Sequence, residues 1–222
     1  MKTYNVKLTG VTPLLMHRDN HSFGASLKSW QTNPDNKARS IPGDDRTPGW
    51  SWIGSVYHDD KVLGVPSDNL MTMLREGGAK VPTGKGQGTY KRQTQSGLIV
   101  METIWPLKNA AGDTIPWAPI KEISTEENFD AHVEAVQKLG FDLMVKRAKI
   151  GQSKHVRVRP IFAAGWTVEG TLTVVDTTIT EKVLSMILTC AGLYCGLGDW
   201  RPSAPKSPGP FGRFEAGAAS RG

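Results

Sequence analysis

A glycine-rich segment, residues 192–214, holds the residue types best suited to binding chemistry. It carries the cations Arg201, Lys206 and Arg213 among closely spaced glycines and prolines. Glycine lets backbone amides approach an oxyanion closely, and guanidinium and ammonium groups add charge-assisted hydrogen bonds. The segment therefore predicts a phosphate-binding loop, with Trp200 beside Arg201 as a ring on which a base can stack. The alternative is a turn that only returns the chain to its sheet.

A second group of cations lies in a stretch without acidic residues, 143–168. Val156 and Val158 alternate there with Arg157 and Arg159, which predicts a strand with one apolar and one doubly basic face. A basic strand face can follow a phosphate backbone, and the alternative is an exposed strand kept soluble by its charge. The candidate phosphate-binding residues of this stretch are Lys146, Arg147, Lys149, Lys154, Arg157 and Arg159.

Residues 78–97 make a third basic stretch, which we predict to be a flexible loop. It contains Lys85, Lys91 and Arg92, with Tyr90 as a further ring for stacking. The alternative is an ordinary surface loop.

The charge distribution along the chain favours a polyanionic partner. The 222 residues include 27 Lys and Arg against 21 Asp and Glu, a formal net charge of +6. The acids gather outside the basic stretches, at Asp44–Asp45, at Asp59–Asp60 and between 122 and 130. Such segregation is typical of proteins that bind nucleic acid, and a solvated basic surface is the alternative.

Catalytic motifs are weaker than these binding motifs. His17 and His21 lie four residues apart with Asp19 between them, so an endoribonuclease that uses His17 or Asp19 is the enzymatic alternative. The sequence has no P-loop, no nucleophile elbow and no paired zinc motif, and Cys190 and Cys195 are its only cysteines. We expect a binding protein without catalytic activity, metal or cofactor, in a reducing, cytoplasmic compartment. No apolar run is long enough for a membrane span.

Strand and helix patterns alternate along the chain in the order of an α+β protein. Strands are predicted at 3–9, 62–65, 98–105, 141–150, 155–162, 166–175 and 210–215, and helices at 67–76, 128–139 and 180–191. This order contains β-α-β-β-α-β, the ferredoxin-like pattern. We predict one antiparallel sheet with strands at 3–9, 98–105, 155–162 and 166–175, one face of which is covered by the helices at 67–76 and 180–191. Residues 109–128 are predicted to be a loop. The open face of such a sheet is a common platform for nucleic acid.

Residues 19–60 interrupt this order, and we predict that they project as an insertion from a single domain, 1–222. Their prolines and glycines oppose regular structure, apart from a small hairpin around Trp50 to Val56. The aromatic side chains of the insertion either stack on bases or pack in a small cluster. They are Trp30, Trp50, Trp52 and Tyr57. The last residues, 216–222, are predicted to fray.

Three segments resemble the repeat-associated mysterious protein (RAMP) superfamily, which supplies the crRNA-binding backbone subunits of CRISPR effector complexes. GLGDWRP at 196–202 and GPFGRF at 209–214 resemble its C-terminal glycine-rich loop. VKLTGVTPLLM at 6–16 is similar to its opening strand and turn. VPSDNL at 65–70, followed by Leu74 and Arg75, is similar to its strand-to-helix element that ends in an arginine. The matches follow the expected order and span the chain, whereas the insertions match no part of the family.

The resemblance implies a modified ferredoxin-like, RRM-like core with a thumb or finger insertion. It also implies backbone-directed binding of single-stranded RNA and head-to-tail assembly of copies along the strand, together with other effector-complex subunits. Such backbone subunits usually lack cleavage activity, although some carry a catalytic aspartate in a loop. Similar small proteins occur in phage genomes, so a phage protein that binds single-stranded DNA and an inhibitory protein are the further alternatives.

Overall fold

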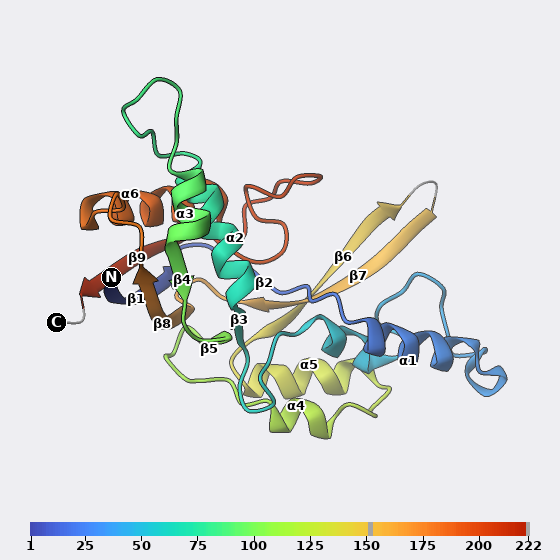
Figure 1. Cartoon of the computed structure of the whole chain (residues 1–222). Helices are drawn as coiled ribbons and strands as arrows, with labels where there is room; N and C mark the ends of the chain where they lie inside the picture. The colour runs from blue at the N-terminus through green and yellow to red at the C-terminus, as the bar shows by residue number, and fades with distance from the viewer. Residues whose placement is uncertain (151–152, 221–222) are drawn as a thin grey trace.

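The computed structural model is an α+β protein with two antiparallel sheets (Figure 1). The structure describes residues 1–150 and 153–220, without the side chains at 149, 150, 153, 154 and 220. The larger sheet contains β1 (Lys2–Gly10), β3 (Gly64–Pro66), β4 (Leu98–Val100), β5 (Ile104–Lys108), β8 (Thr167–Val174) and β9 (Phe214–Ser220). The smaller sheet contains β2 (Leu14–Leu15), β6 (Asp142–Ile150) and β7 (Ser153–Phe162).

The larger sheet has the order β3-β5-β8-β1-β9, with β4 also paired to β8. β1 lies between β8 and β9 and is antiparallel to both. Its apolar residues Tyr4, Val6 and Leu8 alternate with polar ones and are all buried, as the period of two predicts. This arrangement is compatible with a ferredoxin-like layout of β1, α2, β4–β5, β8, α6 and β9.

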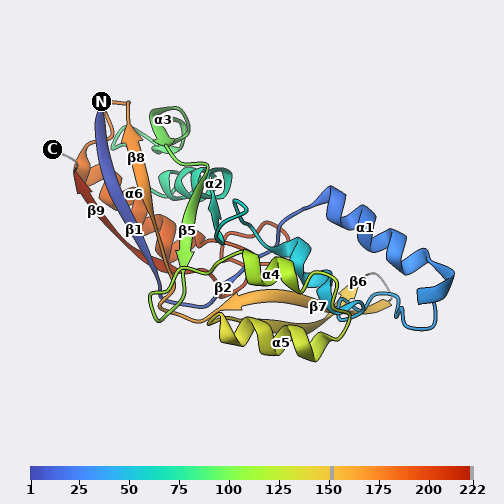
Figure 2. The ribbon, with the colours of Figure 1, turned by 90° about the horizontal axis from the view of Figure 1, so that it is seen from below.

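The helices α2 (Ser67–Gly78) and α6 (Glu181–Cys190) cover the same face of the larger sheet (Figure 2). Each buries one apolar stripe, which includes Leu70 and Leu74 in α2 and Leu184 and Leu188 in α6. The two helices also contact each other. The predicted placement of both helices on one face is therefore confirmed.

The prediction that residues 155–162 belong to the main sheet is wrong. β7 pairs with β6 along its length and with β2 at Phe162, in the second sheet. Alternation along a strand indicates that one face is buried, but not against which core. The predicted strand 98–105 is also interrupted, because β4 and β5 flank residues 101–103, where the Glu102 carboxylate accepts a hydrogen bond from the Thr171 amide at 2.9 Å.

The insertion 19–60 is more regular than predicted. It contains α1 (His21–Thr32) and the 3-10 helices η1 (Pro34–Asn36) and η2 (Gly49–Ser55), so the expected hairpin around Trp50 to Val56 is wrong. Asn20 caps α1 by accepting a bond from the Phe23 amide. No residue of α1 is buried, and the helix projects from the rest of the molecule in Figure 1.

The aromatic residues of the insertion pack against protein, which confirms the packing alternative. Trp50 makes edge-on contacts with Phe23 and Trp30 at centroid distances of 5.4 and 6.4 Å. Trp52 is buried against His132 of α5 (Phe129–Lys138) and Phe141. The insertion and the β6–β7 hairpin therefore share one core.

Three further expectations need correction. The stretch 78–97 is a loop only in its first part, because α3 (Lys91–Gly97) occupies its end. The stretch between 109 and 128, expected to be a loop, contains α4 (Ala118–Glu122). Residues 216–220 do not fray, since they continue β9 and pair with β1, while 221–222 lie outside the described residues. Within the described parts of the chain, no helix is long and apolar enough to cross a membrane.

Candidate nucleic-acid interface

The β6–β7 hairpin divides its predicted cations between two faces. Lys146 lies directly opposite Arg157 in the strand register, and opposed residues of an antiparallel pair share a face. Arg147 follows Lys146 in the strand and therefore lies on the other face. Both Lys146 and Arg147 are exposed. The side chains of Lys149 and Lys154 lie outside the described residues.

The two arginines of β7 are bound by carboxylates of the same chain. Arg157 Nη1 lies 2.7 Å from Asp45 Oδ1, and Arg159 Nη1 lies 3.5 Å from Asp45 Oδ2. Arg159 Nε also lies 3.3 Å from Asp199 Oδ2. The side chains of Arg157 and Arg159 are 29% and 13% exposed, so the predicted doubly basic face is largely closed by carboxylates.

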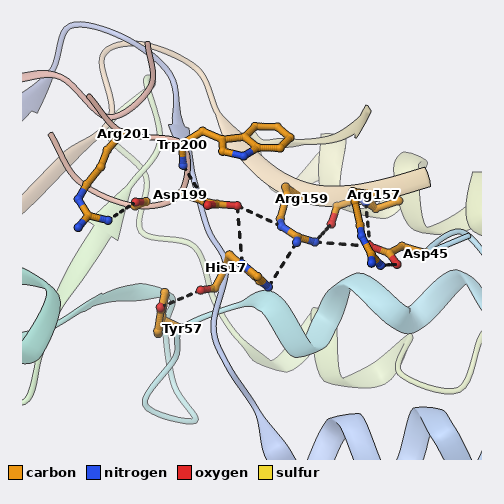
Figure 3. A network of polar contacts seen from close by, with 10 residues as sticks. His17, Asp45, Tyr57, Arg157, Arg159, Asp199, Trp200 and Arg201 are labelled. Atoms are coloured by element: carbon orange, nitrogen blue, oxygen red, sulfur yellow. Dashed lines mark hydrogen bonds and ion pairs between the residues drawn. The ribbon is translucent and has the colours of Figure 1, made fainter. Parts of the chain in front are cut away.

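His17 completes this polar network, shown in Figure 3. Arg159 Nη2 lies 3.3 Å from His17 Nε2, and His17 Nδ1 lies 3.7 Å from Asp199 Oδ2. Because a guanidinium can only donate, Nε2 accepts and the ring proton lies on Nδ1, facing the carboxylate. Partial burial, reinforced by the charge of Arg159, lowers the pKa of His17 against the opposing effect of Asp199. This shift favours the neutral ring.

The glycine-rich segment brings Asp199 and Trp200 to the hairpin. Gly198 has a φ of +77°, and a Cβ at that position would collide with the carbonyl oxygen of Leu15. Trp200 also has a positive φ, 47°, which is uncommon for a bulky residue and marks a constrained position. Its ring lies below Lys146, whose Nζ is 4.2 Å from the ring centroid. The loop and the hairpin thus meet in a cation–π contact.

The three cations of the glycine-rich segment, Arg201, Lys206 and Arg213, differ in their surroundings. Arg201 Nη2 lies 3.3 Å from Glu76 Oε1 at the end of α2, and Glu76 also accepts a hydrogen bond from Ser203. Arg213 donates to the carbonyl of Leu193 in the π-helix η3 (Ala191–Cys195). Arg201 and Arg213 therefore anchor the loop, whereas Lys206 is exposed.

A polar pocket of about 180 Å³ opens beside the loop. Its walls include His17, Tyr57, Asn69 and Arg201 together with residues 196–199. The Tyr57 hydroxyl donates to the His17 carbonyl at 3.0 Å, which fixes the two residues relative to each other. A guanidinium, an amide side chain and glycine backbone are suited to a phosphate or a sugar. Among the residues that the structure describes, no three His, Cys, Asp or Glu side chains are grouped to hold a metal ion.

Two other predicted binding regions lie apart from this network. Lys85, Lys91 and Arg92 are exposed in the α2–α3 loop and in α3, away from the β6–β7 hairpin in both ribbon views. The open face of the larger sheet has a shallow groove of about 660 Å³, in which Lys7 is paired with Glu169 at 3.0 Å. No described residue that lines this groove is aromatic, so it offers no ring for stacking.

Sequence reasoning missed the acidic partners of the network. Asp45 and Glu76 come from segments far along the chain from the cations that they bind, and the segregation of charge in the sequence argued against such pairs. Asp199 lies inside the glycine-rich motif, next to Trp200. That position was the one signal in the sequence that could have identified Asp199 as a residue of the site. Comparisons add no relative, since the chain matches no protein-family model and none of the curated proteins.

Proposed function

We propose that the protein binds single-stranded nucleic acid through the phosphate backbone, with RNA favoured, and that copies assemble head-to-tail along the strand. In this proposal the chain is a backbone subunit of a ribonucleoprotein complex, as the RAMP resemblance implies. The glycine-rich segment would correspond to the C-terminal glycine-rich loop of that family. The β6–β7 hairpin with the 19–60 insertion would correspond to its thumb or finger. Affinity would depend little on base sequence, because phosphates are the groups contacted.

One observation supports this proposal above the others. The glycine-rich loop and the β6–β7 hairpin meet at the Trp200–Lys146 contact. Lys146 lies opposite Arg157 in the strand register, and Arg159 contacts Asp199, the residue before Trp200 (Figure 3). An aromatic ring next to several cations is the usual composition of a single-strand groove. The exposed Lys206 adds a further cation to the glycine-rich loop.

Equilibrium binding to labelled single strands tests the proposal. Oligonucleotides U30 and dT30, of about 30 nucleotides, exceed the usual site of about 4–16 nucleotides and are compared with a duplex of equal length. We expect tight binding to U30 that weakens steeply with salt and exceeds binding to the duplex. Binding to dT30 but not to U30 or the duplex would favour the alternative of a phage protein that binds single-stranded DNA. Failure to bind any of the three would overturn the proposal and favour an inhibitory protein that binds only other proteins.

An endoribonuclease is the second candidate, because His17 lies with Asp199 at the polar pocket. A neutral imidazole can act as a general base, although His17 Nε2 must first lose its bond from Arg159. Labelled RNA incubated with the protein, with and without divalent metal, tests this. Cleavage that His17→Ala abolishes and His21→Ala retains would favour the enzyme, since His21 begins α1 and has no place at the pocket.

A further inference from the structure

The Asp45 carboxylate occupies a position surrounded by donors suited to an oxyanion. Oδ1 lies 2.7 Å from Arg157 Nη1, and Oδ2 accepts from the Val158 amide at 3.2 Å and lies 3.5 Å from Arg159 Nη1. Two guanidinium groups and a backbone amide are also the donors that proteins use for phosphate. The Asp45 side chain is 21% exposed, so this position is open to solvent on one side.

The segment that carries Asp45 lies along the edge of β7. Its backbone extends the edge of β7 through two hydrogen bonds, from Val156 to the Gly43 carbonyl at 2.8 Å and from Asp45 to the Val156 carbonyl at 3.0 Å. The neighbouring Asp44 is paired with Arg46 of the same segment, with Arg46 Nη2 2.6 Å from Asp44 Oδ2. β6 and β7 pair with each other from Asp142 opposite Ile161 to Ile150 opposite Ser153, so the segment can leave the edge without breaking a pair of that ladder.

We propose that Arg157, Arg159 and the Val158 amide form a phosphate-binding site that Asp45 closes when no strand is bound. This inference rests on the proposed function, because the ligand that replaces Asp45 is a phosphate of the bound strand. Asp45 and Asp199 together supply two negative charges to the two arginines, so the site is electrically balanced in the free protein. Opening the segment costs part of the binding energy, and the wild-type affinity is lowered accordingly.

Removal of the Asp45 charge tests the site, with Asp35→Asn as the matched control. Asp35 lies in the same insertion, and its substitution changes the net charge equally, but its side chain is exposed in η1 and, among the described residues, forms no ion pair with the arginines. Binding of inorganic tripolyphosphate and of U30 is measured for wild type, Asp45→Asn, Asp35→Asn and the double variant Asp45→Asn with Arg157→Gln. We expect Asp45→Asn to bind both ligands at least about fivefold more tightly than Asp35→Asn, and Arg157→Gln to remove that gain.

The two ligands separate failure of this site from failure of the proposed function. Equal tripolyphosphate affinities for Asp45→Asn and Asp35→Asn would overturn the site, even where wild type binds U30. A gain for tripolyphosphate without binding of U30 by any variant would support the anion site and overturn the proposed function.

A measurement on the wild-type protein covers the case in which Asp45→Asn does not fold. The amides of Asp45 and Val156 close the segment onto β7, so tripolyphosphate should make them exchange hydrogen several times faster. Unchanged exchange at both amides under saturating tripolyphosphate would show that the segment does not open.

Discussion

Arg159 joins three parts of the molecule that are distant in sequence. Its guanidinium contacts Asp199 of the glycine-rich loop, Asp45 of the insertion and His17. A side chain held by two carboxylates is poorly available to a phosphate, so the exposed Lys146 is the better first contact for a strand. At the scale of single residues, binding is therefore expected to depend on which cations are free as well as on how many there are.

The two faces of the hairpin can be distinguished by the salt dependence of binding. Lys146→Ala should reduce the slope of log K against log salt by about 0.7, the value for one phosphate contact on a single strand. Arg147→Ala serves as the matched control, because it removes the same charge from the opposite face of β6. Measurement of U30 affinity over a salt series checks this. Equal reductions of the salt slope in both variants would mean that the nucleic acid does not bind one face of the hairpin in preference to the other.

His132 should make the stability of the fold depend on pH. Its Nε2 donates to the Glu126 carbonyl at 2.8 Å, whereas Nδ1 is buried with no hydrogen-bond partner among the described residues. Burial lowers the pKa of the ring. Protonation would add an N–H at Nδ1 with no acceptor. Because the folded pKa lies below the unfolded value of 6.5, stability is full above that pH and is lost as the pH falls below it.

Urea unfolding of wild type and His132→Gln at about pH 8 and about pH 5 isolates this effect. The pKa values of His17 and His58 are also lowered, but both residues are present in both proteins. Wild type should lose about 1–3 kcal/mol more than His132→Gln on acidification, the cost of an unpaired buried donor. Equal losses would contradict the prediction.

At the scale of elements, the glycine-rich loop depends on close backbone approach. Gly198→Ala should destabilise the protein by about 2–4 kcal/mol, because the new methyl group meets the Leu15 carbonyl as well as an unfavourable φ. Gly84→Ala is the matched control: its φ of +76° is nearly the same, but no atom lies within 4 Å of the added Cβ. It should cost only about 1 kcal/mol. Thermal and urea unfolding of both variants check the difference.

Helices and strands were predictable from the sequence where a local hydrophobic period determines them. The alternation of Tyr4, Val6 and Leu8 located β1, and the apolar stripe beginning at Leu70 located α2, because each pattern has one period and one buried face. α1 was missed because its apolar stripe is short, Phe23, Leu27 and Trp30, and none of its residues is fully buried. The second sheet was missed because pairing between segments leaves no local signal. The same reason hid the ion pair of Arg157 with Asp45, which are 112 residues apart.

At the scale of the whole molecule, head-to-tail assembly predicts that the number of bound copies follows strand length. Doubling a poly(U) strand from about 30 to about 60 nucleotides should double the number of copies, because each copy covers a fixed span of about 4–16 nucleotides. Native mass spectrometry of the complexes at low salt measures this number directly. The same number of copies on both strands would exclude assembly along the strand while leaving binding itself intact.

The second sheet has a consequence for how such a protein can change over evolution or be recombined. Its β2 strand comes from the chain before α2, whereas β6 and β7 come from the chain after β5. Their shared core places Trp52 from the first segment against Phe141 from the second. Neither segment can be exchanged, shortened or lost alone without exposing the apolar surface of the other. A functional chimaera between two such proteins must therefore inherit both segments from the same parent, and substitutions in one are expected to require compensating substitutions in the other.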